Sequence, residues 1–472
     1  MDNLLLKKGR LAIVLMIVLV ALFPASAKAV VDGIYGETLG ISTTFNLTVK
    51  GGTISMSDGT VSYLWGYADG NGPAQYPGPT LIINQGNNVT VNLTNQIPTI
   101  SGNPQTSVSI VFPGHGVTAT GGVPGLLTRE ASPGQTVTYT FTASQPGTYT
   151  YFSGTQPELQ VEMGLFGAIV VVPATAPDCP ALAPDPVAPS RGYAYCHPDA
   201  YFDREYLFLL SEVDPVVHRL VEQGKMSHVD MTSRHPTAWF INGRNMPDTM
   251  AMAHSSWLPN QPYDSMPMMH PGEMVLMRIV GGGGNLHPLH THGQNHLVIA
   301  RDARLLRSTG SATVDLAVSD YTTTSVPGQT VDAIWGPWTG EKLGWDVYGH
   351  TGTEPGICVP GPVPPTTIDA NGFDINTFEY CPDHGKPIPV KIPAQSLMQF
   401  GAMYGGTPYL GVQGDLPPAH VQQNPMGGFS YMWHSHNERE LTSNNIFIPG
   451  GMATMALVLP YYDMDGNPIQ IP

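Results

Sequence analysis

Short runs of alternating apolar and polar residues constrain the fold of this chain more than any other feature. Between about residues 30 and 173, the runs TLIINQGNNVTVNLTN, TVTYTFTA and GTYTYF are separated by Gly, Pro or Asn at intervals of about 8 to 12 residues. Because successive side chains of a strand point to opposite faces, each run predicts a strand with one buried face. Several such strands in a row are typical of a β-sandwich.

A second strand-rich unit follows a proline-rich segment. Prolines crowd residues 174–199, so this segment cannot form the interior of a sheet and is predicted to be a semi-rigid linker. Within residues 200–460, the runs YLFLLSEVD, EMVLMRIV and MATMALVLP again predict strands, and an insertion at about 340–427 interrupts them. A chain of 472 residues has room for two or three domains. We therefore predict an all-β protein with sandwich domains at residues 30–173 and 200–460.

The charge of the chain excludes one class of partner. The formal net charge is -16, and only 20 residues are Lys or Arg. Binding to a phosphate backbone requires a basic surface, which this composition cannot supply. We therefore expect no nucleic acid partner.

The first 29 residues have the pattern of a signal peptide. Lys7, Lys8 and Arg10 precede the apolar run LAIVLMIVLVALF and the small-residue stretch ASAKA, which predicts cleavage after Ala29. No later stretch reaches the roughly 18 uninterrupted apolar residues that a membrane span needs. We expect an exported protein, periplasmic or secreted, without a stable membrane span after cleavage.

The four cysteines form two local pairs in Pro-rich segments. Two disulfides are the expected state in an oxidising compartment. The alternative, a thiolate metal ligand, is weaker because no cysteine lies in a strand beside a histidine motif. The four residues are Cys179, Cys196, Cys358 and Cys381.

Two histidine motifs carry the main chemical signal. HPLHTHG supplies His287, His290 and His292, and WHSH supplies His434 and His436. In an extended strand, residues two apart share a face, so two HxH strands lying side by side would bring four imidazoles together. Neutral imidazole is a ligand for Cu, Zn, Ni and Fe. The motifs therefore predict a metal site, with structural hydrogen-bonded histidines as the alternative.

Several motifs together resemble the multicopper oxidases. PGPTL, GTYTYF, WFINGRNMPDTM, HPLHTHG, VPGQTVDAIW and WHSH followed by PGGM occur in the order found in that family, over nearly all of the chain after the leader. The chain is most similar to the two-domain members of the family. This resemblance implies two cupredoxin-like Greek-key β-sandwiches, copper as the cofactor, and a homotrimer with metal held between neighbouring subunits.

The resemblance fails at the position of the blue copper ligands. Family members have HCH in the last motif, with the Cys as a copper ligand, whereas this chain has Ser435 there, and Glu440 replaces an expected His. A hydroxyl cannot replace the soft thiolate of a blue copper site. His287 matches a remaining blue-copper ligand and stays a candidate. We expect no type 1 centre.

The first domain has also lost histidines. The family motif HWHG is replaced by FPGHG, which leaves His115, and YHSH is replaced by YFSG, with Phe152 and Gly154 at the histidine positions. Four-electron oxygen reduction by the usual route is therefore not expected. By motif matching, the remaining candidate ligands are His290, His292, His434 and His436, with His115 as a fifth.

Other residues give weaker signals. A Met- and His-rich segment could contact Cu(I), although Met is also an adaptable core residue. Glu438 and Glu440 could be acid/base partners or ligands, or could form a solvated acidic turn. His350 and His384 are isolated, and surface or hydrogen-bonded roles are expected. The segment contains Met246, Met250, Met252, His254, Met266, Met268, Met269 and His270.

Three functions remain open. The first is a copper-binding protein that stores, buffers or slowly redox-cycles copper at a reduced histidine site. The second is an active copper oxidoreductase with a mono- or dinuclear site at a subunit interface. The third is a non-catalytic binding or structural module.

Overall fold

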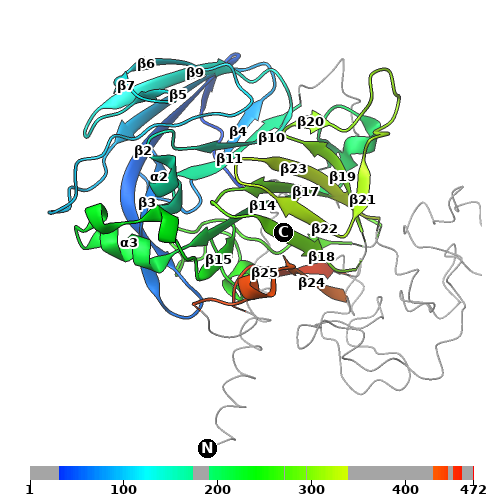
Figure 1. Cartoon of the computed structure of the whole chain (residues 1–472). Helices are drawn as coiled ribbons and strands as arrows, with labels where there is room; N and C mark the ends of the chain where they lie inside the picture. Colours follow the sequence, from blue (N-terminus) through cyan, green and yellow to red (C-terminus); the bar gives the residue numbers. More distant parts are fainter. Residues whose placement is uncertain are drawn as a thin grey trace, which may run out of the picture.

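The structure is a computed structural model, and it confirms the all-β prediction (Figure 1). Its helices in the described part of the chain are short, the longest being α3 with 8 residues. None of the described helices is long and apolar enough to cross a membrane. The predicted leader, most of the predicted linker and the predicted insertion lie outside the described residues. The residues that the structure describes are 31–173, 191–270, 272–293, 295–337, 429–444, 450–459 and 471.

The first sandwich has a six-stranded sheet and a three-stranded sheet. The larger sheet has the order β1-β2-β5-β9-β6, with β3 paired to β2, and the smaller has the order β10-β11-β4. A separate hairpin joins β7 and β8. The elements are β1 Glu37–Leu39, β2 Ser42–Ser55, β3 Val61–Asp69, β4 Leu81–Asn84, β5 Asn88–Asn95, β6 Thr118–Gly121, β7 Val123–Pro124, β8 Arg129–Glu130, β9 Thr136–Thr142, β10 Gly147–Phe152, α2 Pro157–Glu162 and β11 Phe166–Val172.

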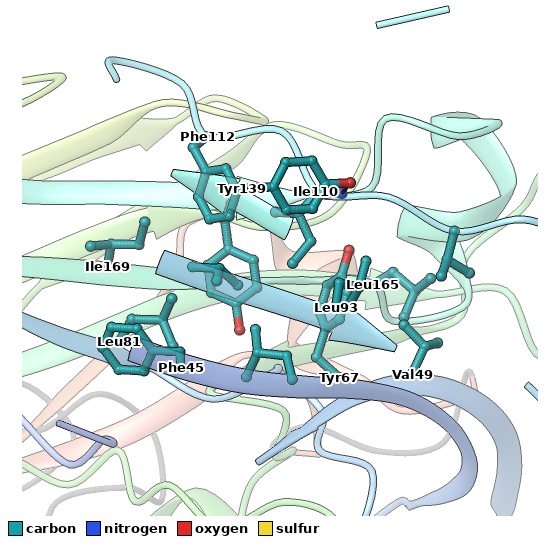
Figure 2. Close-up of a cluster of buried hydrophobic side chains, with 14 of the residues drawn as sticks. Phe45, Val49, Tyr67, Leu81, Leu93, Ile110, Phe112, Tyr139, Leu165 and Ile169 are labelled. Atoms are coloured by element: carbon teal, nitrogen blue, oxygen red, sulfur yellow. Dashed lines mark hydrogen bonds between the residues drawn. The ribbon is translucent and has the colours of Figure 1, made fainter. Parts of the chain in front are cut away.

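The core of the first sandwich follows the alternation in the sequence. On β5, Val89, Val91 and Leu93 are buried, while the side chains between them are half-buried. Tyr67 and Tyr139 come from other strands and join the same cluster (Figure 2). Burial of each large apolar side chain contributes roughly 1.5–3 kcal/mol, so the alternating pattern fixes which face of each strand is turned inward.

The second sandwich has a seven-stranded sheet and a five-stranded sheet. The first has the order β15-β14-β17-β23-β19-β20, with β21 paired to β19, and the second has the order β16-β25-β24-β18-β22. The elements are β12 Gly192–Tyr193, β13 Tyr201–Phe202, β14 Arg204–Val213, α3 Pro215–Glu222, β15 Ala238–Ile241, β16 Met268–Met269, β17 Val275–Gly281, β18 His287–Thr291, β19 His296–Arg301, β20 Arg304–Leu305, β21 Val318–Asp320, β22 Thr322–Ser325, β23 Thr330–Trp335, β24 Phe429–Ser435, β25 Ala453–Val458, and the 3-10 turns η1 Pro198–Ala200, η2 Met226–His228, η3 Met231–Ser233, η4 Asp248–Met250 and η8 Glu438–Leu441.

Aromatic packing fixes β24 against the opposite sheet. Trp433 is fully buried, and its ring centroid lies 5.5 Å from that of Trp335 on β23 and 5.8 Å from that of Phe208 on β14. Aromatic pairs at this spacing are favourable beyond the area that they bury. The strand that carries the WHSH motif is therefore held in place by its inward-facing side chains.

The two sandwiches share an apolar interface. Ile82 and Phe166 from the first sandwich pack in one buried cluster with Leu209, Phe240 and Val280 from the second. A continuous apolar interface of this kind favours one rigid body over two independently moving domains.

Candidate metal centre

The two histidine motifs lie on adjacent strands of the five-stranded sheet. β18 and β24 pair in antiparallel fashion, and His290 lies directly opposite His434 in the register. His292 lies two residues after His290 and therefore faces the same side of the sheet. Strand pairing thus brings the ring of His434 beside those of His290 and His292, which precede it in the sequence by 144 and 142 residues.

The three rings are close enough to share a metal ion. The ligand nitrogens of His290, His292 and His434 all lie within 4.8 Å of one another. The Nε2 atoms of His292 and His434 are 3.1 Å apart. His436 is exposed at the edge of this group, with its ring centroid 4.8 Å from that of His290 and 6.1 Å from that of His434.

Backbone carbonyls fix the orientation of two of these rings. The Nδ1 of His290 lies 2.7 Å from the carbonyl oxygen of Tyr321, and the Nδ1 of His434 lies 2.7 Å from that of Ser435. A carbonyl oxygen only accepts, so each Nδ1 carries the hydrogen and donates it. In the neutral ring, Nε2 then keeps its lone pair, which is the arrangement that orients metal-binding histidines in proteins.

The surroundings keep the cluster uncharged. Burial lowers the pKa of His292 and of His434 to about 4, with a further lowering from the neighbouring imidazoles. Burial also lowers the pKa of His290. At neutral pH these rings are therefore neutral, and neutral imidazole nitrogens fit Cu, Zn, Ni and Fe.

His287 does not lie with the other candidate ligands. It is fully buried, and its Nδ1 lies 2.9 Å from Oε2 of Glu440 while its Nε2 lies 2.8 Å from Oε2 of Glu212. Burial by itself lowers the pKa of His287, but hydrogen bonds to these two carboxylates raise it to about 9. Both ring nitrogens of His287 therefore face carboxylates, and the structure does not bring this ring to the other candidate ligands.

Ser435 and Glu440 occupy the positions at which the sequence departs from the family. Ser435 is fully buried, and its Oγ donates a hydrogen bond of 2.6 Å to Oε2 of Glu440. Glu440 is 3% exposed, so the solvated turn considered for it is not what the structure has, whereas Glu438 is exposed. The described contacts of Glu440 are hydrogen bonds with His287, Ser435 and Asn437.

Sequence reasoning missed Glu212. Burial raises the pKa of its carboxyl, but the hydrogen bond and charge of His287 and the nearby Arg234 lower it to about 2. The available signal was an acidic residue inside the otherwise apolar strand run YLFLLSEVD. A carboxylate in such a run needs a buried cationic partner.

His115 lies in the first sandwich and outside the histidine cluster. Its ring is placed between Phe141 and Tyr149, with centroid distances of 4.5 and 4.4 Å. Burial lowers the pKa of His115 to about 4, and its Nε2 is buried without a hydrogen-bond partner in the described part of the chain. The structure does not bring it to His290, His292 and His434.

The described part of the Met- and His-rich segment makes packing and polar contacts. Met246 is buried in an apolar cluster with Met432 and Met455, and Met250 packs against that cluster. The Nδ1 of His270 donates to the carbonyl oxygen of Leu459 at 3.0 Å. In the same segment, Met268 and Met269 are buried in β16, and Met266 is half-buried. Met252 is 46% exposed, and the Nε2 of His254 lies 2.7 Å from Oδ2 of Asp32.

Three of the four cysteines and both isolated histidines lie outside the described residues. Cys196 is described and is not free. The two predicted disulfides and the roles of His350 and His384 therefore stay predictions.

Two packed β-sandwiches, with a pair of histidine-bearing strands in the second, define this protein as cupredoxin-like. The blue copper oxidase from Nitrosomonas europaea has a similar fold, with a TM-score of 0.50 over 88% of this chain and 85% of that chain, at 16% sequence identity. Residues 48–176 match the multicopper oxidase family.

Relatives of known name agree with this match. The chain is 35% identical over 127 residues to multicopper oxidase MCE from Talaromyces pinophilus, covering 24% of this chain and 19% of that protein. It is 30% identical over 183 residues to copper resistance protein A from Escherichia coli, covering 37% of this chain and 25% of that protein. The chain thus spans about a quarter or less of these relatives. Residues 48–176 thus match a multicopper oxidase domain, and the chain is similar to multicopper oxidases, a family whose members bind copper.

Proposed function

We propose that this protein is an exported copper-binding protein without a blue copper centre, in which His290, His292 and His434 bind the metal. The observation that carries the proposal is the convergence of three neutral imidazoles within 4.8 Å, two of them oriented by Nδ1 hydrogen bonds to backbone carbonyls. The exposed His436 lies beside His290 and is in place to supply a further nitrogen. Copper bound there supplies one-electron chemistry between Cu(I) and Cu(II).

The contacts of Ser435 support the proposed absence of a blue centre. The hydroxyl of Ser435 donates to Glu440, and His287 holds a proton on each ring nitrogen between two carboxylates. A blue centre needs a thiolate together with two imidazole nitrogens. Among the described residues around Ser435 there is no thiolate, and both ring nitrogens of His287 face carboxylates, so we expect no electron entry from a substrate by that route.

Copper loading of the purified protein tests this proposal. We expect binding of Cu(II) that withstands dialysis, weak d-d absorption, and an EPR spectrum with nitrogen couplings from imidazole. His434→Ala should abolish this binding, whereas His228→Ala, which changes an exposed histidine on η2, should leave it unchanged. An intense thiolate-to-copper absorption band would contradict the proposal.

A copper oxidoreductase is the second candidate function. It is favoured by the exposure of His436 at the edge of the cluster, which leaves the site open to a substrate or to a neighbouring subunit of a homotrimer. In that case Glu438, exposed on the turn after the motif, is a candidate acid/base group. Steady turnover that His434→Ala abolishes without unfolding, together with an oligomer mass that changes with copper content, would favour this function.

A non-catalytic module is the third candidate. It predicts no stoichiometric metal after dialysis and a melting temperature that does not change when Cu or Zn is added, because a ligand that binds only the folded state must raise that temperature. Export, to the periplasm or outside the cell, is proposed from the leader pattern. N-terminal sequencing of the mature protein, expected to begin at Val30, tests it.

A further inference from the structure

The histidine strands are tied together on the face opposite the metal cluster. On β18, His287 shares the inward face with Leu289, while His290 points to the other side. On β24, Ser435 lies between the two histidines of the motif and also points inward. The contacts of His287 and Ser435 therefore lie directly behind the proposed copper ligands.

One carboxylate joins the two strands there. Oε2 of Glu440 accepts a hydrogen bond from Nδ1 of His287 at 2.9 Å and another from Oγ of Ser435 at 2.6 Å. Oε1 of the same residue accepts from Nδ2 of Asn437 at 2.9 Å. Glu440 thus connects β18, β24 and the turn that follows β24 through a single buried group.

A buried ion chain continues from this point to the first sandwich. His287 contacts Glu212 at 2.8 Å, Glu212 contacts Arg234 at 2.5 Å, and Arg234 contacts Glu162 of α2 at 2.5 Å. Beyond Glu162, the Nε2 of His218 lies 3.3 Å from Oε1 of Glu162. We call this connected set of buried residues the ion chain, and it consists of His218, Glu162, Arg234, Glu212, His287 and Glu440.

The pairing between β18 and β24 is short. β18 and β24 are paired over three positions, Leu289 with Ser435, His290 with His434, and Thr291 with Trp433. A metal site needs its ligands held to within about 0.5 Å by groups that are themselves fixed. The charge-assisted bonds of Glu440 meet this need, because bonds of this type are shorter and stronger than neutral ones.

We infer that Glu440 is a positioning residue that clamps the two histidine strands from behind, so that the copper-binding geometry of His290, His292 and His434 depends on its contacts with Ser435 and His287. This inference rests on the proposed function for its copper readout. Glu440 does not itself bind the metal, since both of its oxygens accept hydrogen bonds from other groups.

Two variants and a matched control test the inference. Ser435→Ala removes one of the contacts of Glu440, and Glu440→Gln removes its charge at nearly constant shape. The control is Glu222→Gln, an exposed acid on α3, the helix that also carries His218. We expect Cu(II) affinity, measured by competition with a chelator, to fall about 10- to 100-fold in the first two variants, as for other residues that orient metal ligands. We also expect altered EPR hyperfine couplings in these two variants and wild-type behaviour in the control.

The result that overturns the inference is wild-type affinity and wild-type EPR spectra in a folded Ser435→Ala protein, whatever happens to its melting temperature. If Glu440→Gln does not fold, the Ser435→Ala variant still tests the inference. The ring nitrogen chemical shifts of His290 and His434 in the metal-free protein provide a readout that does not need copper. Shifts that move in Ser435→Ala but not in Glu222→Gln support positioning even if the wild-type protein binds no copper, and unchanged shifts contradict it.

Discussion

Replacing Glu212 with glutamine measures how much the ion chain stabilises the fold. His287 and Arg234 lower the pKa of this carboxyl from 4.5 to about 2, against the effect of burial. At about 1.36 kcal/mol per pKa unit, this difference corresponds to about 3 kcal/mol of stability at neutral pH. Loss of one member of a buried ion pair typically costs about 3–5 kcal/mol, which is the same range. We therefore expect Glu212→Gln to lower the free energy of unfolding by about 3 kcal/mol.

The sign of the pH dependence gives an independent check. Because the folded-state pKa of Glu212 is lowered, its contribution is present above pH 4.5 and is lost as the pH falls toward about 2. Denaturant unfolding of the metal-free protein between pH 2 and 7 should show this acid loss in the wild type and a flatter curve in Glu212→Gln. Glu158→Gln, an exposed residue of α2, serves as the control. A loss below about 1 kcal/mol with an unchanged acid limb would refute the reasoning.

Three further outcomes are expected. Burial lowers the pKa of His287, but its carboxylate partners raise it to about 9. The contribution of His287 to the free energy of unfolding is therefore complete below pH 6.5 and is lost as the pH rises through 9. A ring that titrates near pH 6.5 by NMR would contradict this expectation. His115→Phe keeps the ring stacking and removes an unpartnered buried nitrogen, so thermal unfolding should show an unchanged or higher stability, by about 1 kcal/mol, and a weaker decline between pH 6.5 and 4. Ser435→Cys alone should not produce a blue copper spectrum, because His287 stays bound to Glu212 and Glu440; an intense blue colour after copper loading would show that this ring can be released.

The overall fold could be predicted from the sequence because its signal is local. Alternation in runs such as that of β5 places Val89, Val91 and Leu93 on one face, and the structure buries all three. The convergence of His290 and His434 was also predictable, since HxH spacing fixes the face of each strand once the two strands pair. The pairing itself could only be assumed, because nothing local in two motifs more than 140 residues apart specifies which strand lies beside which.

The contacts of His287 could not be predicted in the same way. Its sequence position matches a copper ligand, and what changes its role is the arrival of Glu212 from β14 and Glu440 from η8. These contacts join elements far apart in the chain, and sequence spacing carries no information about them. Glu440 was considered both as an acid/base group and as part of a solvated turn, and only its 3% exposure shows that it is an interior residue.

The buried position of Ser435 and His287 explains why two carboxylates lie beside them. Ser435 and His287 are fully buried, and a buried polar group without a hydrogen-bond partner lowers the free energy of unfolding by about 1–3 kcal/mol. A serine hydroxyl and an imidazole facing one another cannot satisfy three donors, because a protonated ring has no acceptor. Glu440 accepts from both groups with one oxygen, and Glu212 accepts from the remaining ring nitrogen, which leaves all three donors paired. The same contacts that satisfy this interior also join the two histidine-bearing strands to Glu212 and Arg234, and Arg234 in turn contacts Glu162 of the first sandwich.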